Sequence, residues 1–251
     1  MNDGVVRAAG AAGTSGAEPS PLARRRLTLG GVAGLGGAAA YDSFLLARPL
    51  GSSLDPVNAY VSELGVRTQP ASALFRGSDE LAGLLIVVLA LVLRDGLPRH
   101  WHGEAGRAAL AIGGVASVFD GWHPMGCAPS IEAACRPHPD VVGLILQLRQ
   151  AHTVSSVIGV VAALASMLLL GSLLREIPRW RRLGELGLLA ALVVIALGLL
   201  ELPLSLANHW VGLVERVQVL WISGWFVVLA LLALRTASPR RAASRANRLC
   251  S

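Results

Sequence analysis

Three residues near the middle of the chain combine a carboxylate with two imidazoles. Asp120 and His123 are three positions apart, and His152 begins a later apolar segment. Residues at i and i+3 share one face of a helix, and a neighbouring antiparallel helix would bring His152 beside them. Two histidines and a carboxylate are typical zinc ligands, and a zinc ion with an open position activates water. One hypothesis is therefore a membrane-embedded metal-dependent hydrolase whose zinc is bound by Asp120, His123 and His152.

Other polar side chains fall at corresponding ends of the apolar segments. Ionisable residues at membrane depth are costly and usually face a cavity or a partner. These residues could line an outward-facing pocket for a lipid headgroup or small solute, with no reaction. They could equally pair between helices, and Arg76 could pair with Glu80 at i and i+4. The further pocket candidates are Glu80, Ser156, Glu201, His209, Glu215 and Arg216.

Six apolar segments must position these side chains. Each is about 20 residues or longer, which is enough for a helix to cross the hydrocarbon core of a bilayer. A helix also satisfies its own backbone hydrogen bonds in lipid. The segments therefore predict an all-α, polytopic, six-transmembrane-helix bundle. They cover residues 27–47, 73–93, 106–123, 148–174, 184–205 and 213–234.

The composition supports membrane residence. Of the 251 residues, 53% are hydrophobic and only 15% are charged, and the mean hydropathy is +0.57. These values are too apolar for an ordinary soluble domain. The sequence pI of about 10.5 raises the possibility of nucleic-acid binding. However, the arginines flank apolar segments instead of forming one patch with aromatic residues, so no nucleic-acid partner is expected.

The arginine distribution predicts the orientation. With the N-terminus in the cytoplasm, the inner segments carry 16 of the 22 arginines, and most of the acidic residues lie on the outer side. Such a bias places both termini in the cytoplasm. The expected location is a bacterial cell membrane, specifically the inner membrane.

Two terminal segments lie outside the predicted membrane domain, which covers residues 27–235. Residues 1–26 are expected to be a disordered, basic, cytoplasmic segment. Arg24, Arg25 and Arg26 within it also resemble a twin-arginine export signal, and whether this segment is cleaved remains open. Residues 236–251 are expected to form a basic cytoplasmic tail that can touch anionic lipid.

Two of the three cysteines lie in the second outer loop. Cys127 and Cys135 are eight positions apart, with Pro129 between them. An extracytoplasmic loop permits disulfides, so we expect these two cysteines to be bonded. Cys250 would lie on the reducing side and remain a thiol.

Several short motifs occur in an order that resembles a known family. The first outer loop contains Ser62, Glu63, Leu64 and Gly65, and the third segment ends in "VFDGWHPMGC". The fourth segment opens with "LRQAHTVSSVIG" and the sixth with "GLVERVQVLWISGW". Together they resemble the domain-of-unknown-function 998 family of bacterial integral membrane proteins. The resemblance implies six spans and membrane residence, and it brings no reaction, substrate or cofactor. The positions it marks are Ser62, Glu63, Asp120, Pro124, His152, Glu215 and Arg216.

The sequence favours a non-enzymatic membrane protein that binds or moves a lipid or small solute through an outward-facing polar pocket. No cofactor is expected on this interpretation. The metal-dependent hydrolase with zinc is one alternative, and a partner-binding subunit of an envelope complex is another. The oligomeric state, the ligand and the direction of any transport are left open.

Overall fold

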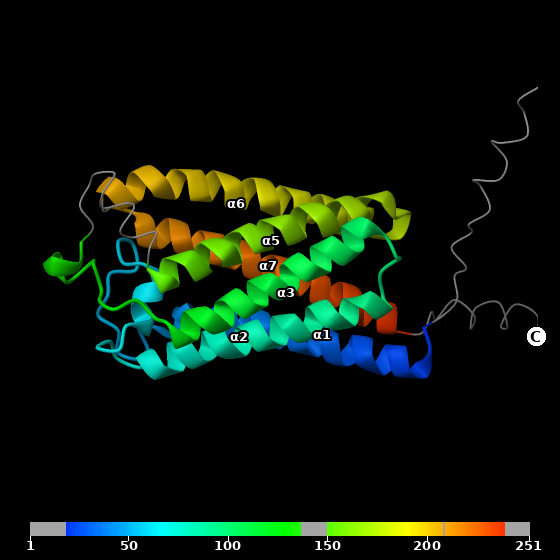
Figure 1. Cartoon of the computed structure of the whole chain (residues 1–251), viewed down its shortest axis with the longest axis horizontal. Coiled ribbons are helices and arrows are strands. Elements are labelled where there is room, and N and C mark those ends of the chain that lie inside the picture. The colour runs from blue at the N-terminus through cyan, green and yellow to red at the C-terminus, as the bar shows by residue number, and fades with distance from the viewer. Residues whose placement is uncertain (1–18, 137–149, 208, 239–251) are drawn as a thin grey trace, which may run out of the picture.

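The computed structural model describes residues 19–136, 150–207 and 209–238, and all regular secondary structure in these ranges is helical (Figure 1). Short 3-10 helices lie in the connections between the long helices. They are η1 (Ser43–Leu46), η2 (Val61–Gly65), η3 (Leu93–Asp95), η4 (Ala133–Cys135) and η5 (Pro178–Trp180). The six long helices are α1 (Pro21–Tyr41), α2 (Ser72–Val92), α3 (Trp101–Trp122), α5 (Ala151–Glu176), α6 (Arg181–Ala207) and α7 (Val211–Ala237).

The long helices form a closed, antiparallel ring. Each packs against the next along the chain, and α7 closes the ring by packing against α1 as well as α6. Figure 1 shows the first turn of α1 and the last turn of α7 at one end of the bundle, here called the terminal end. The connections 42–71 and 123–136 lie at the opposite end, here called the loop end.

Each long helix lies over one predicted apolar segment, but the first begins earlier than expected. Residues 21–26 were predicted to belong to a disordered segment, whereas they form the first turns of α1. Ser20 caps this helix by accepting a hydrogen bond from the Ala23 N–H at 3.2 Å, and Pro21 favours the first helical position. Residues 1–18, the tail beyond residue 238, Cys250, and residues 148–149 of the fourth segment lie outside the described residues.

The longest apolar stretches of the bundle lie in its C-terminal half. Among the described helices, the segments Ala151–Glu176, Pro178–Ala207 and Val211–Ala237 are long and apolar enough to cross a membrane. Helix α2 is 21 residues long, but Arg76, Asp79 and Glu80 lie within its first nine residues. Leucine, valine and isoleucine side chains are exposed over the outside of the bundle, as expected for a surface that faces lipid. The fold therefore has the apolar helices of a membrane protein.

Glycines let neighbouring helix backbones approach closely. Gly83 of α2 and Gly114 of α3 face each other, and a methyl group placed on either would overlap the carbonyl oxygen of the other. Gly171 of α5 and Gly184 of α6 make a similar contact. Small residues are used in this way where helices pack tightly in membranes. These contacts hold α2 against α3 and α5 against α6, and so fix the walls of the site described next.

Candidate functional site

A cavity with several ionisable side chains in its wall lies inside the ring of helices. Its volume is about 130 Å³, several times the roughly 30 Å³ that one water molecule occupies in the liquid. Residues of α1, η1, η2, α2, α3, α5 and α7 line it. The acidic and basic residues among them are Arg76, Asp79, Asp120, His152 and Glu215. Five acidic or basic side chains around one small internal space are unusual in an apolar bundle, so this cavity is the candidate functional site.

Asp120 connects α3 to α5 at the cavity wall. Its carboxylate accepts hydrogen bonds from the hydroxyls of Ser155 and Ser156, the second at 3.2–3.3 Å. The Nδ1 of His152 lies 3.2 Å from Asp120 Oδ1, although the ring is not oriented for a hydrogen bond. His152, Ser155 and Ser156 are one turn apart, so they present one face of α5 to Asp120.

Helix α2 contributes two charged residues without an ionic partner. Arg76 and Asp79 both line the cavity, and among the described residues neither lies within 4.0 Å of an opposite charge. The Nε of Arg76 is buried and has no hydrogen-bond partner there. The predicted ion pair between Arg76 and Glu80 is therefore wrong. Glu80 instead lies over Gly121 of α3, where the absence of a side chain leaves room for it.

The first residues of α7 form hydrogen bonds with the connection between α1 and α2. Glu215 Oε2 accepts a hydrogen bond from the Val61 N–H at 2.5 Å. Arg216 donates through Nη1 to the carbonyl oxygens of Ala59 and Gly212, at 2.7 and 2.9 Å. Arg216 thus binds main-chain oxygens, whereas the sequence analysis offered it as a pocket residue or an ion-pair partner. Glu215 and Val61 both line the cavity, so this junction forms part of its wall.

The Ser-Glu-Leu-Gly motif forms a structural link at the loop end. Glu63 is fully buried and accepts hydrogen bonds from the N–H of Tyr60 at 3.0 Å and from both the N–H and the hydroxyl of Ser130. Ser62 donates to the sulfur of Met125 at 3.2 Å. Burial and nearby carboxylates raise the pKa of the Tyr60 hydroxyl above its usual value, so it stays protonated. We call residues 60–66 and 124–135 together the cap, because both segments contribute to the loop-end wall of the cavity.

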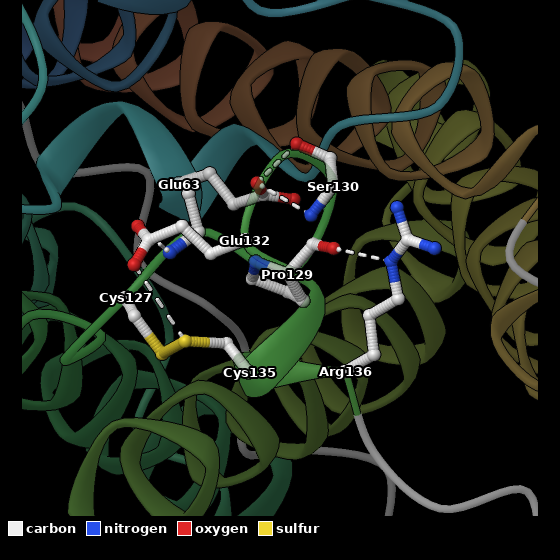
Figure 2. The surroundings of a disulfide bond; sticks show 8 residues. Glu63, Cys127, Pro129, Ser130, Glu132, Cys135 and Arg136 are labelled. Atoms are coloured by element: carbon white, nitrogen blue, oxygen red, sulfur yellow. Dashed lines mark hydrogen bonds between the residues drawn. A yellow bond between two sulfur atoms is a disulfide. The ribbon is translucent and has the colours of Figure 1, made fainter.

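The second cap segment contains a cysteine pair in bonded geometry, drawn in Figure 2. The sulfurs of Cys127 and Cys135 are 2.08 Å apart and their Cα atoms 6.2 Å apart. Arg136 donates to the carbonyl oxygen of Pro129 at 3.2 Å, beside the pair. Figure 2 also shows Ser130, inside the nine-residue ring, reaching out to Glu63. The ring closed by the two cysteines therefore contains Ser130, which donates hydrogen bonds to the buried carboxylate of Glu63.

The structure brings together only some of the predicted site residues. Asp120, His152, Ser156 and Glu215 line the cavity, as do Ser62, Leu64 and Gly65 of the motif. His123 is exposed and stacks on Phe119, with 4.8 Å between ring centroids. It ends α3 as the C-cap residue. The predicted candidates that do not line the cavity are Glu80, His123, Glu201, His209 and Arg216.

The arrangement of the described residues does not favour metal binding or an activated serine nucleophile. In the described part of the chain, one group of three possible ligands converges within 4.8 Å, namely Cys127, Glu132 and Cys135. Its sulfurs are bonded to each other, and a disulfide is not the thiolate that binds metals. Asp120 and His152 meet without His123. The hydroxyl of Ser155 donates to Asp120 and not to the His152 ring, so the serine–imidazole pair of a nucleophilic hydrolase is not formed here.

Two charged residues of the cavity, Arg76 and Asp79, were not among the predicted pocket candidates. Asp79 was noted only as one of several ionisable residues near the outer helix ends, and Arg76 was assigned to a partner on its own helix. Tyr41, Ser117 and Gln218 also line the cavity. Their positions depend on which faces of the helices turn inward, and the apolar pattern gives little information about that.

A ring of long apolar helices, with ionisable side chains around an internal cavity and a capped loop end, is typical of a helical membrane protein. The chain belongs to the family described as "Protein of unknown function (DUF998)", whose model matches residues 7–232. Comparison with curated proteins and with solved structures gives no significant match.

Proposed function

We propose that this protein spans a bacterial inner membrane six times, with both termini in the cytoplasm, and binds a lipid headgroup or small polar solute in its internal cavity. The observation that carries the proposal is the cavity itself. Five acidic or basic side chains from four helices surround about 130 Å³ of space in a bundle with an apolar exterior. Charges are kept at membrane depth when they meet a partner.

The orientation in this proposal rests on the arginine bias. The arginine-rich connections and both described chain ends lie at the terminal end, so the positive-inside rule assigns that end to the cytoplasm. The cavity and the cap then face outward. An outward location also permits the bond between Cys127 and Cys135.

Binding without chemistry is favoured over hydrolysis by the contacts at Asp120. Its carboxylate accepts hydrogen bonds from two serine hydroxyls and lies beside the His152 ring, as expected for a pre-organised binding wall. A partner-binding subunit would need an apolar face and no internal cavity, so the cavity also favours ligand binding.

Native mass spectrometry of the purified protein, combined with metal analysis, tests the proposal. We expect a mass increment that matches a lipid or small polar molecule and that falls in an Asp120→Asn variant. Asp95→Asn is the matched control, because Asp95 lies at the terminal end, where it pairs with Arg26 at 3.8 Å. Finding no bound molecule, and no rise in melting temperature with any added lipid or polar solute, would contradict the proposal. Stoichiometric metal in place of an organic ligand would favour the hydrolase.

A further inference from the structure

The charged groups of the cavity fall into two classes. Asp120 and Glu215 already accept hydrogen bonds, the first from two serine hydroxyls and the second from a main-chain N–H. Arg76 and Asp79 are not engaged by any described residue of opposite charge. Ser117 lies close to Asp79 but donates to its main-chain oxygen, at 3.0 Å. The carboxylate of Asp79 therefore keeps its capacity to accept hydrogen bonds.

Arg76 and Asp79 are three positions apart, so they share one face of α2 and offer opposite charges side by side. They line the same cavity but lie too far apart to form an ion pair with each other. A charge that is removed from water and left without a partner is strongly unfavourable. A molecule that carries both signs of charge could satisfy the two groups together.

We propose that the cavity binds a zwitterionic group, whose phosphate or carboxylate is held by Arg76 and whose ammonium is held by Asp79. This inference rests on the proposed function, because it names the ligand class of the same cavity. A purely anionic group would leave Asp79 unpaired and would also face Asp120 and Glu215. A purely cationic group would leave Arg76 unpaired. The guanidinium binds phosphate or carboxylate through paired N–H donors, and the carboxylate accepts from an ammonium.

The zwitterion has two possible sources, a phospholipid headgroup or a free solute such as an amino acid. Three lipids with the same acyl chains separate the charge classes: a zwitterionic phosphatidylethanolamine, an anionic phosphatidylglycerol and a cationic trimethylammonium lipid. Glycerophosphoethanolamine and alanine probe the free solutes. The full chain is purified in detergent, and binding of each probe is measured by native mass spectrometry and by the shift in melting temperature.

We expect a zwitterionic probe to bind about tenfold more tightly than the singly charged lipids. Asp79→Asn should remove the preference for the zwitterion over the anion, and Arg76→Gln should weaken binding of both. Arg67→Gln and Asp55→Asn are matched controls, because both residues are exposed at the loop end and neither lines the cavity. They should leave the preference unchanged. Preference for the phospholipid over both solutes identifies the source as a headgroup, and the reverse identifies it as a free solute.

The outcomes separate this inference from the proposed function. If no probe binds the wild-type protein and no ligand is retained, the proposed function fails and the inference fails with it. If a probe binds but the wild type prefers a singly charged lipid, only the inference is overturned. It is also overturned if Arg76→Gln and Asp79→Asn lower the melting temperature and leave the preference intact, since the two residues would then serve the fold alone.

Discussion

The two halves of the ring differ in how they are built. Helices α5, α6 and α7 each contain an apolar stretch long enough to cross a membrane. In the other half, α1 and α3 are rich in glycine and alanine, and charged residues interrupt the first half of α2, including the unpaired charges of the cavity. The C-terminal half thus has the longest apolar stretches, while the N-terminal half contributes most of the charged residues in the cavity wall. A search by hydropathy alone therefore gives less weight to helices α1, α2 and α3, although these helices carry more of the charged residues of the candidate site.

The largest effect is expected from breaking the close packing of the N-terminal half. Valine at Gly83 would force the backbones of α2 and α3 apart at Gly114. Overpacking costs about 1–3 kcal/mol, and because the atoms that a side chain at Gly83 would meet include main-chain atoms of α3, we expect the upper end of this range. Gly83→Val should therefore lower the melting temperature in detergent substantially. Gly77→Val is the matched control on the same helix, because a side chain there meets no atom within 4 Å. Equal stability of the two variants would contradict the role given to this contact.

The next largest effect is expected at the cap. Replacing Cys127 and Cys135 together by serine frees the nine-residue ring in the unfolded chain and loosens Ser130 in the folded one. For so short a ring the loss should be about 2 kcal/mol. Urea or thermal unfolding of the double variant measures it, and a reducing agent added to the wild type should reproduce the shift. If reduction leaves the melting temperature of the wild type unchanged, the cysteine pair has no stabilising role.

A smaller effect is expected from the buried carboxylate of the motif. Glu63→Gln keeps the size of the side chain but replaces one acceptor oxygen that faces Ser130 with a donor. A lost hydrogen bond at a buried site costs about 1–2 kcal/mol. Glu185→Gln is the control, since Glu185 forms an exposed i,i+4 pair with Arg181 and such pairs contribute at most about 0.5 kcal/mol. The idea that the motif ties the cap together fails if both variants melt at the same temperature.

The smallest effect is expected from replacing Asp55, which lies in the exposed turn that precedes the cap. Hydrogen bonds from the Val57 N–H and the Asn58 side chain lower the pKa of the Asp55 carboxyl below its usual value. A carboxyl whose pKa falls on folding stabilises the fold above its unfolded pKa, and this contribution is lost as the pH drops through the folded value. Asp55→Asn should therefore slightly flatten the profile of melting temperature against pH below about pH 4. A variant profile as steep as that of the wild type would contradict this assignment.

The sequence predicted the helices well because membrane-type helices are encoded by long apolar runs. It also predicted the contact between the His152 face of α5 and Asp120, since i,i+3 and i,i+4 spacing on antiparallel neighbours constrains that geometry. It assigned His123 to the same group, but the helix ends there and the ring turns outward onto Phe119. It paired Arg76 with Glu80 on local spacing alone, whereas the approach of Gly121 draws Glu80 to α3. Rotation of a helix about its own axis decides such cases, and the surrounding helices set that rotation.

The proposed orientation places the cavity with its ionisable side chains on the outer side of the membrane. A cysteine placed at Ser156, in the cavity wall, tests it in a Cys250→Ser background with Cys127 and Cys135 left bonded. Ser166 is the control position, because it is fully buried on the same helix and does not line the cavity. In intact cells we predict that a membrane-impermeant methanethiosulfonate reagent modifies the cysteine at 156 and not the one at 166. Modification at 156 only in inside-out vesicles, or at the same rate at both positions, would contradict the account.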